Sequence, residues 1–438
     1  MGWIAWPMLI PLLLGTLVLL LYAVVVQGRM HALAETTYRA SAQRNATLIE
    51  GLVGFETLKA MGAEAPIQRK WEHSAALLAR VGAQLRLLSS SASNGAAFVQ
   101  QTVNLAIVIL GVWLIGERML TMGGLIACSI LGGRVLAAVM MVPGLMVQHA
   151  HARVAIDGVE GLYKLATETT PGVQPLTPSV LHGHYVVDSV SFAYGKAPPA
   201  VDVKRLTVTA GERIGILGPV GSGKSTLLRM MAGLYQPTAG RVLIDGLDVS
   251  HVAREAMSRH VGYVQQDHRL FEGSLRQNLL VGLPNPGDDV IKAAMAQTGL
   301  LDLVAAHPMG LDLPIFEGGK GLSGGQKQLL VFTRLVLAQP KVMLLDEPTA
   351  SMDGGTEARC LNALRSPQLA SSTLVLVTHK PSMLAAVSRV LVMSRGQVVM
   401  DGPRDAVLAQ LSKNTQAESG AVRQVSPAGA VEATGVSA

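Results

Sequence analysis

The chain has 438 residues, of which 49% are hydrophobic and 15% charged, and its formal net charge is +6 at pH 7. The mean hydropathy of +0.37 is high for a soluble protein, and the length allows two or three domains. The sequence shows no basic stripe interleaved with aromatic residues, which argues against nucleic-acid binding, and the two separated cysteines exclude a disulfide framework and a CxxC metal site.

Three long apolar stretches before residue 150 predict membrane-spanning helices at about 3–26, 96–115 and 119–147. Each is long enough for the roughly 20 helical residues that cross a bilayer core. The first has no basic flank before it and no small-residue cleavage site after it, so it is interpreted as a span and not as a signal peptide.

A segment rich in helix-forming residues, 27–86, separates the first two spans, and its basic residues outnumber its acidic ones. The positive-inside rule therefore places 27–86 in the cytoplasm, where two antiparallel helices would reach tens of Å beyond the membrane. With this topology Met1 lies on the far side of the membrane, and three spans make a poor translocation pathway. We therefore expect that the chain lacks its natural N-terminal part or that another polypeptide supplies it.

The second half of the chain has a different pattern of hydrophobic residues from the first half. Residues 1–152 form the predicted transmembrane domain, 153–183 a linker, 184–413 an α/β domain and 414–438 a flexible tail. The segments Arg213–Leu217, Val342–Leu345 and Thr373–Val377 are short, apolar and separated by helical patterns, which is typical of buried parallel strands.

A glycine-rich loop follows the first of these strands and precedes a helical pattern at Leu227–Leu234. The motif is Gly218, Pro219, Val220, Gly221, Ser222, Gly223, Lys224, Ser225 and Thr226. Such a loop cradles phosphates with backbone N–H groups and the helix dipole, while the lysine supplies a charge for the β and γ oxygens and the serine a hydroxyl for Mg²⁺. The loop predicts binding of ATP with Mg²⁺.

Two acids end the next apolar strand. Asp346 is placed to hold Mg²⁺, directly or through water, and Glu347 is the predicted general base for the attacking water. The alternative, two acids that cap a helix, would not explain why a buried strand delivers them opposite a phosphate loop.

The pentapeptide Leu322–Gln326 resembles the signature motif of ABC ATPases. Ser323 is predicted to cap a helix over Gln326–Leu337, and its hydroxyl, the nearby N–H groups and the helix dipole form an anion site. The resemblance implies that Ser323, Gly324, Gly325 and Gln326 bind the γ-phosphate held by a second copy. Two subunits, in a homodimer, would then pack head to tail around two ATP molecules.

The same resemblance assigns roles to single residues. Tyr194 is similar to the aromatic that stacks on adenine, and Gln266 to the glutamine that senses Mg²⁺ and the membrane domain. His379 is similar to the histidine that contacts the γ-phosphate, and Asp353 lies in a segment similar to the D-loop. The resemblance therefore implies catalytic roles for Glu347, His379, Lys224 and Gln266, and metal contacts for Ser225, Gln266 and Asp346.

Further stretches resemble the permease/ATPases of type I protein secretion. These are Glu317–Gly321, Leu48–Ala60 in the cytoplasmic arm and Leu120–Cys128 in the last span. The resemblance implies three of the six spans of an ABC exporter fold, followed by a P-loop ATPase domain, in a bacterial inner membrane. Expected partners are membrane lipid, a second subunit, a periplasmic adaptor, an outer-membrane channel and a secreted protein cargo.

Two alternatives remain open from the residues. One is a lipid or drug exporter with the same ATPase, and the other is a truncated, non-transporting regulatory ATPase subunit. Adjacent genes for an adaptor and a repeat-rich secreted protein would favour the protein exporter.

Overall fold

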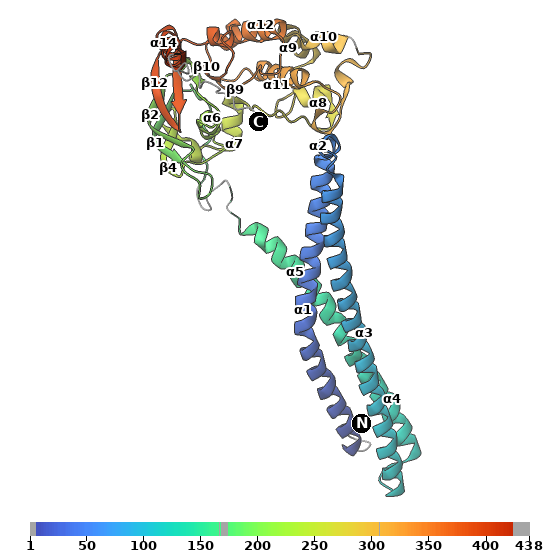
Figure 1. The fold of residues 1–438 in the computed structure, drawn as a ribbon. Helices are drawn as coiled ribbons and strands as arrows, with labels where there is room; N and C mark the ends of the chain where they lie inside the picture. Colours follow the sequence, from blue (N-terminus) through green and yellow to red (C-terminus); the bar gives the residue numbers. More distant parts are fainter. Residues whose placement is uncertain (1–5, 166, 168–173, 306, 424–438) are drawn as a thin grey trace, which may run out of the picture. The chain divides into compact units, whose positions relative to one another are not determined.

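A computed structural model describes residues 6–165, 167, 174–305 and 307–423. The chain forms two compact units, Met1–Glu168 and Thr169–Ala438. The first unit is helical and the second is α/β, so the predicted fold class is confirmed (Figure 1).

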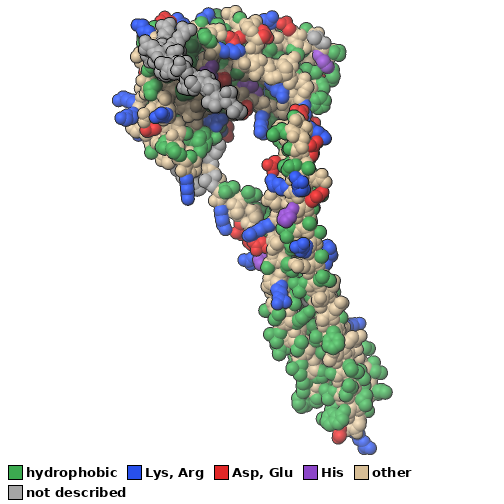
Figure 2. All heavy atoms as spheres, in the orientation of Figure 1, with side chains coloured by type: hydrophobic (Ala, Val, Ile, Leu, Met, Phe, Trp, Pro, Cys, Tyr) green, Lys and Arg blue, Asp and Glu red, His purple; other side chains and the backbone are tan. Residues whose placement is uncertain are grey.

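The helices of the first unit are α1 (Leu9–Val53), α2 (Phe55–Met61), α3 (Glu64–Gly116), α4 (Met122–Met140) and α5 (Val142–Tyr163). Among the described residues, three helical segments are long and apolar enough to cross a membrane, namely Trp6–Val53, Glu64–Gly116 and Met122–Met140. The predicted spans are continuous with the segment 27–86, because α1 and α3 each extend from an apolar half into a charged half. Figure 2 shows hydrophobic side chains over the distal half of this unit and charged side chains over the half that ends in α2.

Helices α1 and α3 lie side by side and pack through small residues (Figure 1). A Cβ atom at Gly15 would collide with the side chain of Val103, and one at Gly111 would collide with Leu125 of α4. Without a hydrophobic driving force between helices in lipid, such close approach is the main source of attraction. The glycines therefore set the spacing of the helices.

The third predicted span needs correction. We expected one helix over about 119–147, but α4 ends at Met140, Met141 forms a turn, and α5 begins at Val142. Pro143 explains the break, because it has no backbone N–H to continue the hydrogen bonds of α4 and is tolerated in the first turn of α5.

Helix α5 continues to Tyr163, so the first part of the predicted linker 153–183 is helical. Residues 166 and 168–173 of that linker lie outside the described residues.

The second unit contains two main sheets. The first is antiparallel and has the strand order β2-β1-β4-β5. The second has the strand order β12-β11-β3-β10-β9-β6 and is parallel except for β12. A third, small sheet pairs β7 with β8. The strands are β1 (Tyr185–Phe192), β2 (Val201–Val208), β3 (Arg213–Leu217), β4 (Ala239–Ile244), β5 (Leu247–Asp248), β6 (Val261–Val264), β7 (Gly273–Ser274), β8 (Pro314–Ile315), β9 (Val342–Asp346), β10 (Thr373–Val377), β11 (Arg389–Ser394) and β12 (Gln397–Pro403).

Nine helices accompany these strands in the described part of the unit. They are α6 (Lys224–Met231), α7 (Arg254–His260), α8 (Leu275–Leu279), α9 (Asp288–Thr298), α10 (Leu300–Ala305), α11 (Gly324–Ala338), α12 (Gly354–Leu364), α13 (Pro367–Ala370) and α14 (Arg404–Arg423). The last helix extends past residue 413, where we expected the domain to end, and 424–438 of the predicted tail lie outside the described residues.

The central strands β9 and β10 are buried on both faces, because alternate side chains enter two different hydrophobic clusters. Leu344 and Val375 pack with the β1–β2–β4 side, whereas Leu345 and Leu376 pack with α8–α12. A strand covered on both faces is apolar at every position, which is why the sequence marked these segments so clearly. The predicted strands at 213–217 and 373–377 match the structure, and the third ends one residue later, at Asp346.

Phe332 on α11 is the large aromatic side chain of the cluster that packs against α8–α12, and it is fully buried. We expect Phe332→Ala to lower the free energy of unfolding of this unit by about 3–5 kcal/mol, because it removes buried apolar surface and leaves a cavity. Differential scanning calorimetry of the full chain would measure this, with the exposed Val399→Ala as control. Equal melting temperatures for the two variants would contradict the packing described here.

Candidate functional site

The glycine-rich loop connects β3 to α6, and its shape depends on three glycines with positive φ. The φ angles are 148° at Gly218, 80° at Gly221 and 94° at Gly223. A Cβ at Gly218 would collide with the carbonyl oxygen of Met393, and one at Gly223 with that of Ala200. The loop can therefore curl only with glycine at these two positions.

Helix α6 begins at Lys224, three residues before the predicted start at Leu227. The difference matters, because Lys224, Ser225 and Thr226 then lie in the first turn, where helix N–H groups have no intrahelical partner. These N–H groups and the positive end of the helix dipole face the loop, which is the arrangement that binds phosphate.

The ammonium group of Lys224 is held inside the loop. Its Nζ donates to the carbonyl oxygens of Gly218 at 2.7 Å and Pro219 at 2.8 Å, and to the hydroxyl of Ser222 at 3.4 Å. Burial lowers the pKa of Lys224, and the nearby carboxylates of Glu347 and Asp346 act in the opposite direction. The lysine is thus placed where a phosphate oxygen could replace the carbonyl acceptors.

Asp346 ends β9 and is almost fully buried. Burial raises the pKa of its carboxyl group, while a hydrogen bond from the hydroxyl of Ser225 opposes the rise. A buried carboxylate beside a serine hydroxyl at the end of a phosphate loop is an oxygen donor set that suits Mg²⁺, which prefers one or two protein ligands together with phosphate oxygens and water. Among the described residues, no cluster of three or more His, Cys, Asp or Glu side chains could hold another metal ion.

Glu347 and His379 come together from neighbouring strands. Glu347 Oε1 lies 3.4 Å from His379 Nε2, and the backbone N–H of Glu347 donates to the carbonyl oxygen of Val377 at 2.9 Å. This bond extends the β9–β10 pairing by one residue. Glu347 has a φ of 49°, a conformation that is strained for a residue with a side chain and is often found at functional sites.

Ser323 caps α11, as predicted, in a reciprocal arrangement. The N–H of Gln326 donates to Ser323 Oγ at 3.2 Å, and the N–H of Ser323 donates to Gln326 Oε1 at 2.8 Å. A Cβ atom at Gly325 would lie 2.7 Å from the carbonyl oxygen of Ser351, so the signature segment runs against the loop that follows Glu347. Helix α11 begins at Gly324, two residues before the predicted start.

Asp353 caps the next helix, α12, by accepting from the N–H and the hydroxyl of Thr356, both at 2.9 Å. These bonds hold the pKa of Asp353 below its usual range. Asp353 therefore has a clear local role at the end of the loop.

Tyr194 follows β1, and its hydroxyl lies 3.0 Å from Thr226 Oγ1. Its ring forms T-shaped pairs with the rings of Phe192 and Tyr235 at centroid distances of 5.0 and 5.9 Å, and the residue remains 46% exposed. A partly exposed aromatic ring therefore lies next to the phosphate loop, as stacking on the adenine of a bound nucleotide would require.

Gln266 follows β6, the strand beside β9, and is exposed. Within the described part of the chain it makes no hydrogen bond to the other predicted site residues. The structure therefore brings together the phosphate loop, Asp346, Glu347 and His379, and leaves Gln266 at the margin.

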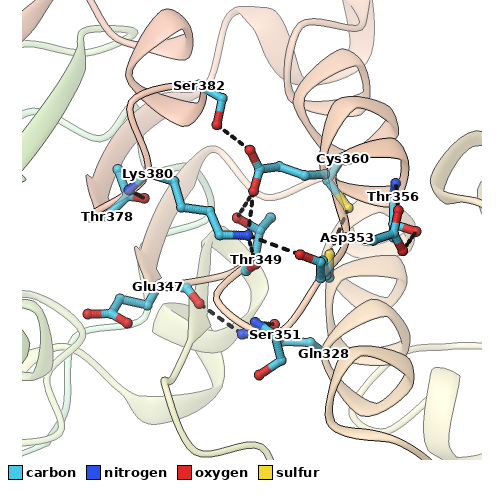
Figure 3. A network of polar contacts seen from close by, with 12 residues as sticks. Gln328, Glu347, Thr349, Ser351, Asp353, Thr356, Cys360, Thr378, Lys380 and Ser382 are labelled. Atoms are coloured by element: carbon cyan, nitrogen blue, oxygen red, sulfur yellow. Dashed lines mark hydrogen bonds and ion pairs between the residues drawn. The ribbon is translucent and has the colours of Figure 1, made fainter.

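Three residues were missed by sequence reasoning. Gln328 is buried and donates to the carbonyl oxygen of Glu347 at 2.9 Å, while its Oε1 accepts from the N–H of Ser351 at 2.8 Å. Lys380 and Glu357 form an ion pair at 2.6 Å beside the same loop (Figure 3). The only available signals were a lysine directly after His379 and a glutamate one helical turn after Asp353.

Comparison with known families supports both units. Residues 201–350 match the model described as ABC transporter, and residues 1–138 match the model described as ABC transporter transmembrane region. Together these matches cover more than half of the chain.

Curated relatives of this chain include secretion proteins of Gram-negative bacteria. The chain is 29% identical over 378 residues to the cyclolysin secretion/processing ATP-binding protein CyaB of Bordetella pertussis, which covers 86% of this chain and 52% of that protein. It is 27% identical over 392 residues to the alpha-hemolysin translocation ATP-binding protein HlyB of Escherichia coli, which covers 89% of this chain and 55% of that protein. The chain thus spans about half the length of the curated relatives it matches.

Among solved structures, a bacterial Atm1-family ABC exporter with ATP bound is similar to this chain. The TM-score is 0.83 at 25% sequence identity, and the match covers 95% of this chain and 72% of that one.

Two glycines of the phosphate loop give a matched test of its shape. Both have positive φ, but a Cβ at Gly223 would collide with Ala200, whereas a Cβ at Gly221 has no neighbour within 4 Å among the described residues. We expect Gly223→Ala to bind a fluorescent ATP analogue about fivefold to a hundredfold more weakly than Gly221→Ala, because overpacking of this kind costs about 1–3 kcal/mol. Equal affinities would contradict the close approach to Ala200.

Proposed function

We propose that this chain, which belongs to the ABC transporters and is a multi-pass membrane protein, is the ATP-hydrolysing permease subunit of a protein exporter. One observation carries the proposal: three adjacent parallel strands deliver the phosphate loop, the acids Asp346 and Glu347, and His379 to one edge of the sheet. A structural ATPase-like domain would not need a base, a histidine and a buried lysine within reach of one another.

In the proposed reaction, Glu347 accepts the proton of the attacking water. Its carboxylate is accessible, with 21% of the side chain exposed, and its backbone is fixed by Val377 and Gln328. His379 lies beside this carboxylate, where its imidazole could contact the γ-phosphate and keep the water in line. Lys224 would exchange its carbonyl acceptors for phosphate oxygens and so stabilise the charge of the transition state.

Mg²⁺ would be held by Ser225 and Asp346, with Gln266 as a further contact that has to approach from the margin of the site. When bound, the ion neutralises charge on the β- and γ-phosphates. The residues fit it, because both contribute oxygen atoms and the Ser225 hydroxyl interacts with the Asp346 carboxyl group and opposes the rise of its pKa.

The proposed working unit is a homodimer. Ser323, Gly324 and Gly325 offer helix N–H groups and a hydroxyl at the start of α11, and this segment resembles the motif that meets the γ-phosphate of a partner subunit. Among the described residues of one chain, the hydrogen bonds of the Asp353 and Ser323 side chains are local capping bonds. Their proposed nucleotide contacts therefore belong to the partner's ATP.

The proposed cargo is a secreted protein. The relatives CyaB and HlyB carry names that refer to secretion and translocation of protein toxins, and the segments Leu48–Ala60 and Glu317–Gly321 resemble those of type I secretion permeases. We place the subunit in a bacterial inner membrane, together with a periplasmic adaptor and an outer-membrane channel. Helix α2 is the proposed coupling element between ATP turnover and the spans.

Replacement of the proposed base tests the chemistry. We expect Glu347→Gln to slow ATP hydrolysis by at least about a hundredfold, because general-base catalysis typically contributes that much or more, while ATP binding is retained and a closed dimer accumulates. Phosphate release and size-exclusion chromatography with ATP would measure both effects, with the exposed Glu255→Gln of α7 as control. Normal turnover in Glu347→Gln would exclude this residue as the base.

The transported substrate can be tested in the source organism. We expect a chromosomal Glu347→Gln replacement to remove one or a few proteins from the culture medium, as measured by quantitative mass spectrometry, whereas Glu255→Gln leaves them unchanged. Energy for export is lost although the subunit still assembles. An unchanged medium together with increased drug sensitivity or altered membrane lipids would instead favour the drug or lipid exporter.

A further inference from the structure

Two loops of the proposed site are joined by an ion pair between the half-buried Lys380 and the buried Glu357, which has no role in the mechanism above. The first loop follows Glu347 and ends at Asp353, and the second runs from Thr378 to Ser382 and carries His379. Figure 3 shows Lys380 extending from the second loop to the first, and its ammonium group pairs with the carboxylate of Glu357.

The ammonium group of Lys380 uses all of its hydrogen-bonding capacity on this connection. It donates to the carbonyl oxygens of Thr349 at 2.7 Å and Met352 at 3.1 Å, and it pairs with Glu357 Oε2 at 2.6 Å. An ammonium has three donors and no acceptor, so every donor has a partner. Because both carbonyls belong to the first loop, Lys380 fixes the backbone of that loop and not only a side chain.

Glu357 completes the connection from the other side. Only 8% of its side chain is exposed, and its carboxylate accepts from Ser382 Oγ of the second loop and from Thr349 Oγ1 of the first. Burial would raise the pKa of Glu357, but the hydrogen bonds from Lys380 and Ser382 outweigh burial and hold this pKa below its usual range. The group is therefore a charged, fully engaged acceptor between the loops.

Gln328 extends the network to the signature helix. This residue of α11 bonds the carbonyl oxygen of Glu347 and the N–H of Ser351, at 2.9 and 2.8 Å. A continuous series of hydrogen bonds thus runs from α11, through the loop after Glu347, to the residue next to His379.

We propose that Lys380 and Glu357 are positioning residues that keep Glu347 and His379 in a fixed relation and connect them to the start of α11. The proposal rests on the proposed function, because it adds a connection to the same hydrolytic site. Removal of Lys380 leaves a buried carboxylate and two carbonyl oxygens without their partner, so both loops must rearrange. A shift of about 1 Å in reacting groups can reduce a rate about a hundredfold.

Hydrogen exchange tests the connection without requiring turnover. In the full chain in lipid nanodiscs, we expect Lys380→Met to accelerate exchange about tenfold in peptides from both 347–353 and 378–382, and Lys380→Arg to restore most of the protection. The control is Arg359→Met, which breaks an exposed ion pair with Asp302 on the same helix, α12. Faster exchange in 378–382 alone, in neither loop, or equally in the control would overturn the proposal.

Kinetics test the role in hydrolysis. We expect Lys380→Met to lower kcat about tenfold to a hundredfold with little change in KM. In a chain that already carries His379→Ala, we expect the same replacement to lower kcat far less, because Lys380 acts through His379. Equal effects in both backgrounds would overturn the positioning role. A wild-type chain that binds ATP without hydrolysing it would instead disprove the proposed function, and the exchange experiment would still decide whether the pair joins the two loops.

Discussion

The site depends on the order of three parallel strands, β3, β10 and β9, that are covered by side chains on both faces. Because the strands are parallel, their carboxyl ends meet at one edge, and each strand is followed directly by a functional segment. A ligand site outside the carboxyl ends of the strands is the general outcome of this architecture. Burial on both faces also fixes the register, since a shift by one residue would exchange the side chains that enter the two clusters. The distance of 3.4 Å between Glu347 and His379 is therefore a consequence of core packing as much as of the loops themselves.

Buried charge is the second constraint on this edge of the sheet. Lys224, Asp346 and Glu357 are all largely withdrawn from water, and each would be costly without a partner. Lys224 is satisfied by carbonyl oxygens, Asp346 by Ser225, and Glu357 by Lys380 and Ser382. Groups that are fixed in this way need little reorganisation when charge develops on a phosphate, which is the main requirement of electrostatic catalysis. The same bonds that keep the fold from losing stability also keep the site in its working arrangement.

The sequence predicts a feature well when the local pattern of residues directly reflects the place of the segment in the folded structure. The strands around Ile216, Leu344 and Val375 were predicted because they contain short apolar runs, and the site residues because they follow such strands. The helix break at Met141 was missed, since the hydropathy of 119–147 is continuous and only the backbone of Pro143 marks the change. Gln328, Lys380 and Glu357 were missed for a different reason. Their partners are mostly backbone atoms or residues of other elements, and no periodicity in the sequence records such contacts.

The membrane unit is organised around its two long helices, α1 and α3. The buried positions of α1, from Leu12 and Leu19 through Ala23 and Met30 to Ala34, recur every three or four residues and continue without interruption from the apolar half into the charged half. A stripe of this period is the buried face of an α-helix, and α1 packs against α3, α5 and α4. The helix ends only at Gly54, near the ion pairs of Lys59 with Glu64 and Lys70 with Glu50, at 2.6 and 3.1 Å, which hold α2 and the adjoining helix ends together. Helix α1 has no break between its span and this tip, and Gly15 in its apolar half lies in close contact with Val103 of α3. The apolar and charged halves of α1 therefore belong to one continuous helix that is packed against α3.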